Sequence, residues 1–219
     1  MKEKLHNLSE QHSLISNWIS ELRNVHIQQD RMRFRRNLER IGEVIGYEIS
    51  KTMPSEKQEI HTPLGKHLSQ TLIAQPVLAT ILRAGLPLHQ GLLNYFDRAD
   101  NAFLAAYRKH TDEVHFEIEL EYLSCPDLSG RTIILCDPML ATGASLVKCW
   151  EQMQSAGSAD KLHIVCAIAS LPGVEYVQKH IPEAEIWCGD IDPELTDKGY
   201  IHPGLGDAGD LAFGQKAQH

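Results

Sequence analysis

The most constraining feature of this sequence is a short apolar run that ends in an acid and continues into a turn of small residues. The run from Arg131 to Cys136 is rich in β-branched residues and apolar on both faces, which is typical of a buried parallel strand. Such a strand delivers the next residue, Asp137, to the ligand-binding edge of its sheet. From Ala141 to Ser145 the side chains are small enough for backbone N–H groups to approach an anion at a helix start. The segment therefore predicts an anion site beside a carboxylate.

A phosphate monoester fits this turn, with the Thr142 and Ser145 hydroxyls as additional donors. The turn is not a triphosphate-binding P-loop, because no Lys follows Gly143 in the arrangement of that motif. An acid one turn from a phosphate cradle suits the vicinal hydroxyls of a ribose whose 5-phosphate lies in the loop. An ordinary strand-to-helix turn of another α/β protein is the alternative that this motif leaves open.

A second informative segment, from Gly199 to Asp210, contains four glycines, one proline and two acids. This composition excludes a regular helix or strand, and its glycines allow the backbone to approach a flat ligand closely. A flexible tail is the alternative interpretation.

Both segments carry a family resemblance. The segment from Asp137 to Ser145 resembles the phosphoribosyl pyrophosphate motif of type I phosphoribosyltransferases. Its residue sequence is similar to the form of that motif found in uracil phosphoribosyltransferases. The run from Gly199 to Asp210 resembles the uracil-binding loop of that family almost residue for residue. Thr80 to Leu86 looks like the family's pyrophosphate loop, and Ala106 to Lys109 follows in the expected order.

The resemblance implies pyrimidine salvage: transfer of the 5-phosphoribosyl group from 5-phosphoribosyl 1-pyrophosphate (PRPP) to uracil, giving uridine monophosphate (UMP) and pyrophosphate. It implies that PRPP is bound by Arg83, Arg108, Asp137, Pro138, Met139, Leu140, Ala141, Thr142, Gly143, Ala144, Ser145 and Asp207. Uracil is implied to be bound, mainly through backbone groups, by Ile201, Gly206, Asp207 and Ala208. The catalytic positions in this set are Arg83, Arg108, Asp137 and Asp207. Mg²⁺ is expected as cofactor, held mainly through the pyrophosphate with Asp207 as a candidate contact and no other direct protein ligand.

Four departures from the family pattern leave the level of turnover open: Pro87, Ala144, His202 and Leu211. If residue 144 requires a positive φ, alanine costs on the order of 1 kcal/mol there. The alternative function is a weakly active or inactive paralogue that binds nucleotide and regulates pyrimidine metabolism, in one version by contacting RNA. A close pyrimidine analogue in place of uracil also stays open.

Composition supports an enzyme acting on small molecules. The 219 residues, 42% of them hydrophobic, are expected to form one domain over residues 1–219. The net charge of −8 argues against a nucleic-acid partner. No apolar run approaches the length of a membrane span and the first residues lack a secretory h-region, so the expected location is the cytoplasm. The five cysteines are expected to be reduced, and the twelve histidines form no metal-binding motif.

Periodicity predicts an α/β fold with a central, mostly parallel sheet flanked by helices. Residues 1–53 are expected to form a helical arm, with one apolar stripe from Leu5 to Val25 and a second helix from Phe34 to Ile49. Val114 to Tyr122 alternate as in a half-buried antiparallel strand, and their position resembles the family's flexible excursion and β-arm. Strands over 162–169 and 184–188, a helix over 174–180 and a base-binding loop over 199–214 complete the prediction.

The basic run from Arg31 to Arg36 has two interpretations. A solvated helix face is favoured over a site for an effector phosphate, such as that of GTP, or for a partner's acidic face. The apolar N-terminal stripe also suits packing on a second subunit, so a homodimer or higher homo-oligomer is expected.

Overall fold

The computed structural model of the chain describes residues 4–110 and 116–216, and the side chains of residues 4–105 and 121–216. Its main sheet has the strand order β1-β10-β9-β7-β4-β5-β6, with the short strand β8 paired to β9. Every neighbouring pair is parallel except β5 and β6, which are antiparallel. The strands of this sheet are β1 (Leu5–Asn7), β4 (Val77–Leu82), β5 (Asp100–His110), β6 (Phe116–Ser124), β7 (Thr132–Cys136), β8 (Met139–Leu140), β9 (Lys161–Ser170) and β10 (Glu185–Asp192).

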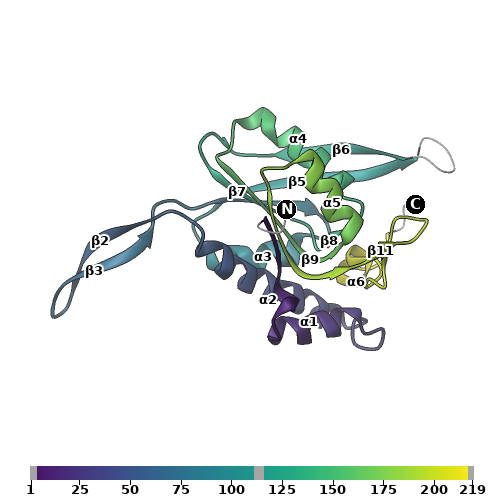
Figure 1. The fold of residues 1–219 in the computed structure, drawn as a ribbon, viewed down its shortest axis with the longest axis horizontal. Helices are drawn as coiled ribbons and strands as arrows, with labels where there is room; N and C mark the ends of the chain where they lie inside the picture. Colours follow the sequence, from purple (N-terminus) through teal and green to yellow (C-terminus); the bar gives the residue numbers. More distant parts are fainter. Residues whose placement is uncertain (1–3, 111–115, 217–219) are drawn as a thin grey trace.

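Helices cover both faces of the sheet (Figure 1). Helices α1 (Leu14–Arg23), α2 (Arg31–Ser50) and α3 (Leu86–Tyr95) pack on one face, and α4 (Ala144–Met153) and α5 (Leu171–His180) on the other. Successive strand residues alternate between the two apolar cores: Leu78 belongs to the first core, and Val77 and Ala79 belong to the second. The prediction of a mostly parallel sheet flanked by helices is confirmed.

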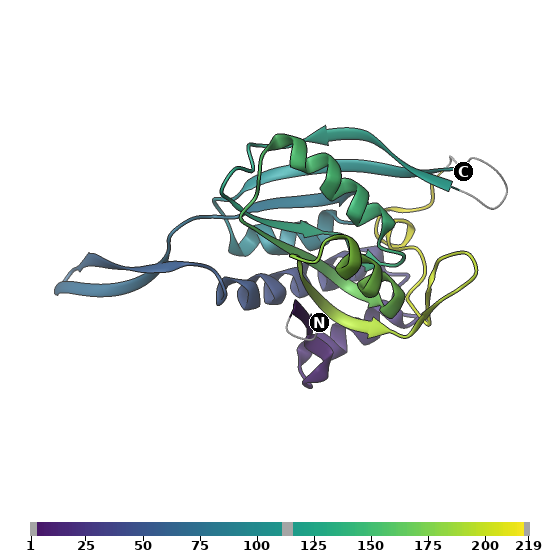
Figure 2. The same cartoon turned by 45° about the horizontal axis from the view of Figure 1, so that its top comes forward.

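The carboxyl ends of the parallel strands meet at one edge of the sheet. Arg83 follows β4, Asp137 follows β7, and Ser170 ends β9. Beyond β10 the chain continues through β11 (Glu194–Leu195), β12 (Ile201–His202) and the short helix α6 (Ala208–Phe213), which returns to this edge. Figure 2 shows this last segment, coloured yellow, beside the sheet.

The beginning of the chain differs from the predicted helix. Leu5 lies in β1, which pairs in parallel with β10, and Leu8 begins a short 3-10 helix that ends at Glu10. The helix itself begins at Leu14, where the Ser13 side chain caps its N-terminus. The prediction of an α-helix at Leu5 and Leu8 is therefore wrong, because Leu5 pairs with β10 at the sheet edge and Leu8 belongs to the 3-10 helix. The stacking of the His6 ring on Trp187, with centroids 3.7 Å apart, accompanies that pairing.

The element that projects from the body is a two-stranded hairpin, β2 (Ser55–Thr62) and β3 (Gly65–Leu72). It extends to the left of the molecule in Figure 1, and no sequence pattern predicted it. The predicted antiparallel strand over Val114–Tyr122 is confirmed for its described part, which belongs to β6 and pairs with β5 at the edge of the main sheet; Val114 lies outside the described residues. Helices α1 and α2 form as predicted within residues 1–53, and their buried residues, such as Ile19 and Leu38, pack on the sheet.

Within the described residues, no helix is long and apolar enough to cross a membrane. All five cysteines are free thiols, as expected, and four of them are buried.

Candidate active site

The predicted phosphate turn connects β7 to α4 and is fixed by main-chain contacts with β9. The Asp137 N–H donates to the Val165 carbonyl at 3.1 Å, and the Pro138 carbonyl accepts from the N–H groups of Ala167 and Ile168. Part of the turn is β8, in which Met139 pairs with Ile168. These bonds leave the second half of the turn, from Ala141 to Ser145, at the start of a ten-residue helix, where N–H groups favour an anion.

Gly143 is the position in this turn that requires glycine. Its φ is +79°, and a Cβ atom added there would lie 3.0 Å from the Gly173 carbonyl oxygen. Ala144 is the first residue of α4, and among the described residues no non-glycine residue has a positive φ. The alanine at this departure from the family pattern is therefore unstrained, and the expected cost of about 1 kcal/mol does not arise.

Asp137 lies at the rim of the sheet, partly enclosed. Burial raises the pKa of this carboxyl to about 7; the Met139 N–H, which donates to its Oδ1 at 3.5 Å, opposes the rise, and the charge of Asp207 adds to it. A carboxylate with this pKa gains from donors such as ribose hydroxyls, because a ligand that donates to the charged form stabilises it.

The loop after β4 brings Arg83 to the same edge. Its Nη2 donates to Asp210 Oδ1 at 3.1 Å and to the Gly214 carbonyl at 3.0 Å. Gly85 lets the chain turn tightly into α3, since an added Cβ would meet Thr80 Oγ1 at 2.1 Å. Pro87 stands in the first turn of α3, a position that proline favours, so this departure fits the helix entrance.

The base-binding segment, defined here as residues 199–214, lies against both loops. A Cβ added at Gly199 would be 3.4 Å from Thr142 Cγ2 of the phosphate turn. A Cβ added at Gly209 would be 3.8 Å from both Ala84 Cβ and Arg83 Nη2 of the pyrophosphate loop. The structure therefore brings the three predicted motifs to one edge of the sheet, although they are far apart in the sequence.

The predicted uracil-binding residues differ in exposure. Ile201 and Ala208 are buried, so they offer backbone groups and not side chains to a ligand. Gly206 has a φ of +99° and is exposed. Asp207 is exposed and caps helix α6, its Oδ1 accepting from the Asp210 N–H at 2.9 Å.

Three side chains from α1, α2 and the loop between them hold this segment in place. Arg23, at the end of α1, donates to both carboxylate oxygens of Asp192 and to the Gly204 carbonyl. Gln28 Nε2 donates to the Leu205 carbonyl at 3.0 Å, and Arg35 Nη1 donates to the Ala212 carbonyl at 2.6 Å. No motif marks Arg23 or Gln28, and the basic run containing Arg35 does not reveal this contact, because the partners lie about 180 positions away in the sequence.

The basic run from Arg31 to Arg36 is therefore only partly a solvated helix face. Arg35 contacts the base-binding segment, as stated above, while Arg33 pairs with Glu21 and Arg36 with Glu39 at exposed positions.

Three other predicted positions have clear placements. Arg108 lies on β5 opposite Ile118, and its side chain is outside the described part of the chain. His202 faces solvent and its Nδ1 lies 2.8 Å from Glu194 Oε1. Leu211 is partly buried against the first apolar core, where a basic residue would lose that packing.

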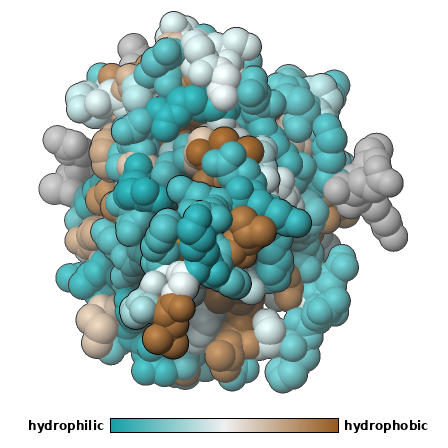
Figure 3. Space-filling model, turned by 90° about the vertical axis from the view of Figure 1, so that its left-hand side faces the viewer, coloured by the Kyte–Doolittle hydropathy of each residue, from teal (hydrophilic) through white to brown (hydrophobic). Residues whose placement is uncertain are grey.

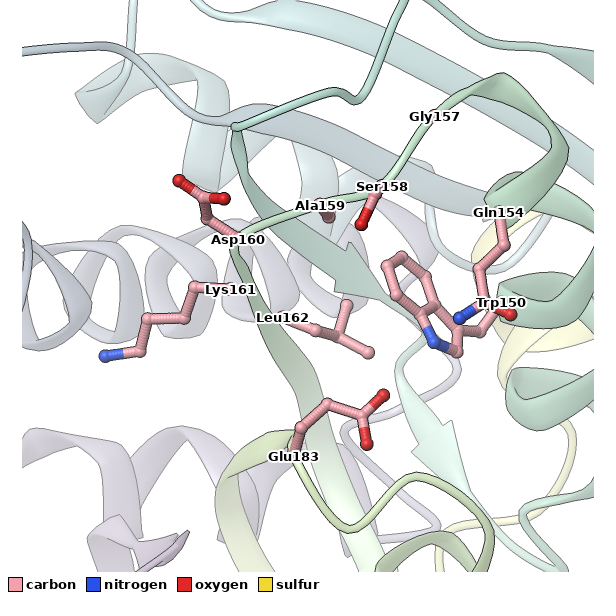
Figure 4. Close-up of a pocket in the computed structure, with 9 residues that line it drawn as sticks. All are labelled: Trp150, Gln154, Gly157, Ser158, Ala159, Asp160, Lys161, Leu162 and Glu183. Carbon is pink, nitrogen blue, oxygen red and sulfur yellow. The ribbon is translucent and has the colours of Figure 1, made fainter.

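Two cavities differ in their relation to these motifs. One of about 910 Å³ is lined by Gly206 and Asp207 together with Arg31 and Arg35. Another of about 350 Å³ opens at the opposite, amino edge of the sheet, where Lys161 and Leu162 begin β9 beside Trp150 (Figure 4). No residue of the predicted site lines this second cavity, so the candidate site is the carboxyl edge.

The described residues contain no group of three or more His, Cys, Asp or Glu side chains able to hold a metal ion. Asp137 and Asp207 are near enough for their charges to interact. This pair suits Mg²⁺ bound mainly through substrate phosphates, since that ion often takes only one or two protein carboxylates.

An acid followed by a small-residue anion turn at the carboxyl edge of a mostly parallel sheet is the arrangement predicted for a phosphoribosyltransferase. Comparison with known proteins narrows this class. A family model described as uracil phosphoribosyltransferase matches residues 9–215. The uracil phosphoribosyltransferase of Porphyromonas gingivalis is 47% identical over 211 residues, covering 96% of this chain and 98% of that protein.

The uracil phosphoribosyltransferase of Pyrococcus furiosus is 39% identical over 191 residues, covering 85% of this chain and 81% of that protein. The solved structure of the AQ2163 protein from Aquifex aeolicus superimposes with a TM-score of 0.85 at 32% identity, covering 97% of this chain and 99% of that one. The chain belongs to the uracil phosphoribosyltransferase family.

Proposed function

We propose that the protein transfers the 5-phosphoribosyl group of PRPP to uracil, releasing pyrophosphate and forming UMP in pyrimidine salvage. The observation that carries this proposal is the position of the base-binding segment, which passes close to Thr142 of the phosphate turn and accepts a hydrogen bond from Arg83 of the pyrophosphate loop. The proposed sites for the base, the ribose 5-phosphate and the diphosphate therefore lie side by side. Family membership supports the same reaction.

In this reaction the chain acts by positioning and by electrostatics. The N–H groups and hydroxyls of Thr142 to Ser145 bind the 5-phosphate, while the Asp137 carboxylate accepts hydrogen bonds from the ribose hydroxyls. Backbone groups at Ile201, Gly206 and Ala208 orient the uracil ring. Arg83, together with Arg108 on β5, neutralises the charge that develops on the departing diphosphate. No side chain attacks the sugar, because the base itself is the nucleophile.

Mg²⁺ fits this site as a partner of the diphosphate. Asp207 would hold it, with Asp137 nearby, and the ion would supply charge neutralisation on the leaving group. The protein residues would align the base with the ribose and the diphosphate.

The regulatory alternative finds no specific support among the described contacts. Arg83, Asp137 and Asp207 are all present at one edge of the sheet, and Ala144 and Pro87 are accommodated without strain. An active enzyme is therefore the stronger proposal.

The test is UMP formation from uracil, PRPP and Mg²⁺, with parallel assays on cytosine, hypoxanthine and orotate. We expect turnover with uracil, little with the other bases, and loss of turnover in Asp137→Asn. A folded chain that binds PRPP and turns over none of these bases would contradict the proposed reaction and favour the regulator.

We further propose that the enzyme is a homodimer or higher homo-oligomer acting in the cytoplasm, and that the β2–β3 hairpin contacts a second copy. An isolated two-stranded hairpin is marginally stable in water, and this one exposes Ile60, Leu64 and Leu68. Hydrophobic patches lie among hydrophilic surface on the side from which it projects (Figure 3). Sedimentation of the intact chain and of a variant with Leu64 and Leu68 changed to Ser tests this; equal masses for both would contradict it.

A further inference from the structure

We propose that Asp210 is a positioning residue that fixes the Arg83 guanidinium, and that through it the base-binding segment is coupled to the binding of the diphosphate. This inference rests on the proposed function and deepens it.

The first observation is where Arg83 points. Its Nη2 donates both to Asp210 Oδ1 and to the Gly214 carbonyl, at 3.1 and 3.0 Å. Both partners belong to the base-binding segment, more than 120 residues further along the chain. The guanidinium of the pyrophosphate loop is thus held by the part of the chain proposed to bind the base.

Stability does not account for this contact. The Arg83 and Asp210 side chains are 38% and 33% exposed, and ion pairs at such exposure contribute little to folding. An ion pair of small energetic value that joins two binding loops fits a role in orienting the arginine.

The second observation is a hydrogen-bond donor on the Arg83 side chain that is unpaired in the described part of the chain. Arg83 Nε is buried and has no hydrogen-bond partner within the described residues. A buried donor without a partner is costly, so an acceptor is expected in the liganded state. With Nη2 committed to Asp210 and Gly214, the Nε–H remains for an oxygen of the diphosphate.

The third observation is that Asp210 is itself fixed by the segment around it. Its N–H donates to Asp207 Oδ1 at 2.9 Å, and its carbonyl accepts from the Gly214 N–H at 2.8 Å. Gly209 passes close to Arg83, since a Cβ added there would lie 3.8 Å from Arg83 Nη2. A continuous set of contacts therefore leads from Asp207, through Asp210, to Arg83.

Because these contacts are shared, a change in the base-binding segment alters the orientation of Arg83, and binding at either site affects the other by the same factor. Uracil bound to the segment should tighten pyrophosphate binding, and the tightening should depend on Asp210.

The experiment measures the Kd of magnesium pyrophosphate by calorimetry, with and without uracil, for the intact chain, Asp210→Asn and Asp210→Ala. We expect Asp210→Ala to raise this Kd about fivefold or more, with uracil no longer changing it. Asp210→Asn keeps an acceptor oxygen and should fall between the two. In steady-state assays the KM for PRPP should rise more than kcat falls.

A double-mutant cycle with Arg83→Ala decides whether Asp210 acts through Arg83. In the Arg83→Ala background, Asp210→Ala should have no further effect on the Kd. Equal fold-changes in both backgrounds would overturn the proposal, as would a loss of kcat with unchanged Kd and KM. An intact chain whose pyrophosphate affinity does not respond to uracil would overturn the coupling.

Two controls keep these outcomes distinct. Asp160→Asn removes an exposed carboxylate at the amino edge of the sheet and should leave every Kd unchanged. Thermal unfolding of each variant identifies any that fails to fold, and Asp210→Asn then carries the test. If the intact chain binds pyrophosphate but forms no UMP, the proposed function fails while the binding cycle still tests Asp210.

Discussion

The phosphate turn and the base-binding segment close the same site but are held in different ways. The turn is fixed by main-chain bonds to its neighbouring strand, such as those of Asp137 with Val165 and of Pro138 with Ala167. The base-binding segment is fixed mostly by side chains from remote elements, including Arg23 and Arg83. The comparison teaches that the phosphate cradle is a local structure, whereas the base site depends on single side chains far away in the sequence.

The largest expected effect lies in the phosphate turn. Asp137→Asn should lower UMP formation roughly a hundredfold or more, because the amide cannot accept hydrogen bonds from the ribose hydroxyls as the carboxylate does. Steady-state turnover, with Asp160→Asn as the matched control, measures it. A fall of less than about tenfold would remove Asp137 from the proposed alignment of the sugar.

Although Asp137→Asn should lower activity, it should raise the stability of the fold above neutral pH. The folded pKa of Asp137, about 7, lies above its ordinary value, so the group favours folding at low pH and this contribution is lost as pH rises through 7. Asp137→Asn should therefore unfold at a higher temperature than the intact chain at pH 8, and the difference should shrink towards pH 4. A difference that is constant with pH would mean that this carboxyl is not perturbed.

The next largest effect concerns the remote support. Arg23→Met should destabilise the fold by on the order of 3 kcal/mol, because it leaves the buried Asp192 carboxylate without its cation. It should also raise the KM for uracil more than the KM for PRPP, since Gly204 loses a donor. Denaturant unfolding and kinetics measure the two effects.

Asp192→Asn in the Arg23→Met background is the control, and it should recover part of the stability by removing the unpaired charge. Equal increases in both KM values would show that Arg23 supports the whole edge of the sheet and not the base-binding segment in particular.

A smaller effect separates two adjacent residues of the phosphate turn. Gly143→Ala should cost about 1–2 kcal/mol and weaken PRPP binding, because it places a Cβ at positive φ and close to Gly173. Ala144→Gly, which restores the usual family residue, should cost about 0.5–1 kcal/mol and bring no gain in turnover, since residue 144 is helical. Higher activity in Ala144→Gly would contradict this assignment of the strained position.

The smallest effect is expected at His202. Its side chain is exposed and pairs only with the exposed Glu194 among the described residues, so His202→Ala should change kcat/KM for uracil by less than about twofold. Lys198→Ala, an exposed residue of the preceding turn, is a comparable surface control. A tenfold loss in His202→Ala alone would mean that the ring reaches the base.

Local signals made part of this structure predictable. The apolar run to Cys136 and the second helix, from Arg31 to Ser50, were placed within a few residues, because composition and periodicity there agree with the final packing. Gly143 was part of a predicted tight turn, and its positive φ follows from that geometry. The family resemblance indicated which loops meet.

Other features could not be predicted because they have no local cause. β1 forms only by pairing with β10, and its residues carry a helix-like spacing. The β2–β3 hairpin is exposed on both faces, so it lacks the alternating pattern that marks a half-buried strand. The support from Arg23 and the contact between Arg83 and Asp210 arise from the tertiary fold.

The hydrogen bonds that Arg23 and Arg35 donate to the base-binding segment have a consequence for biosynthesis. Arg23 and Arg35 leave the ribosome long before their partners Gly204 and Ala212, which are about 180 residues later in the chain. The hydrogen bonds of these two arginines can therefore form only after the base-binding segment has been synthesised. The proposed base site is therefore completed later in synthesis than the phosphate turn, whose main-chain contacts with β9 lie within about 30 residues of it.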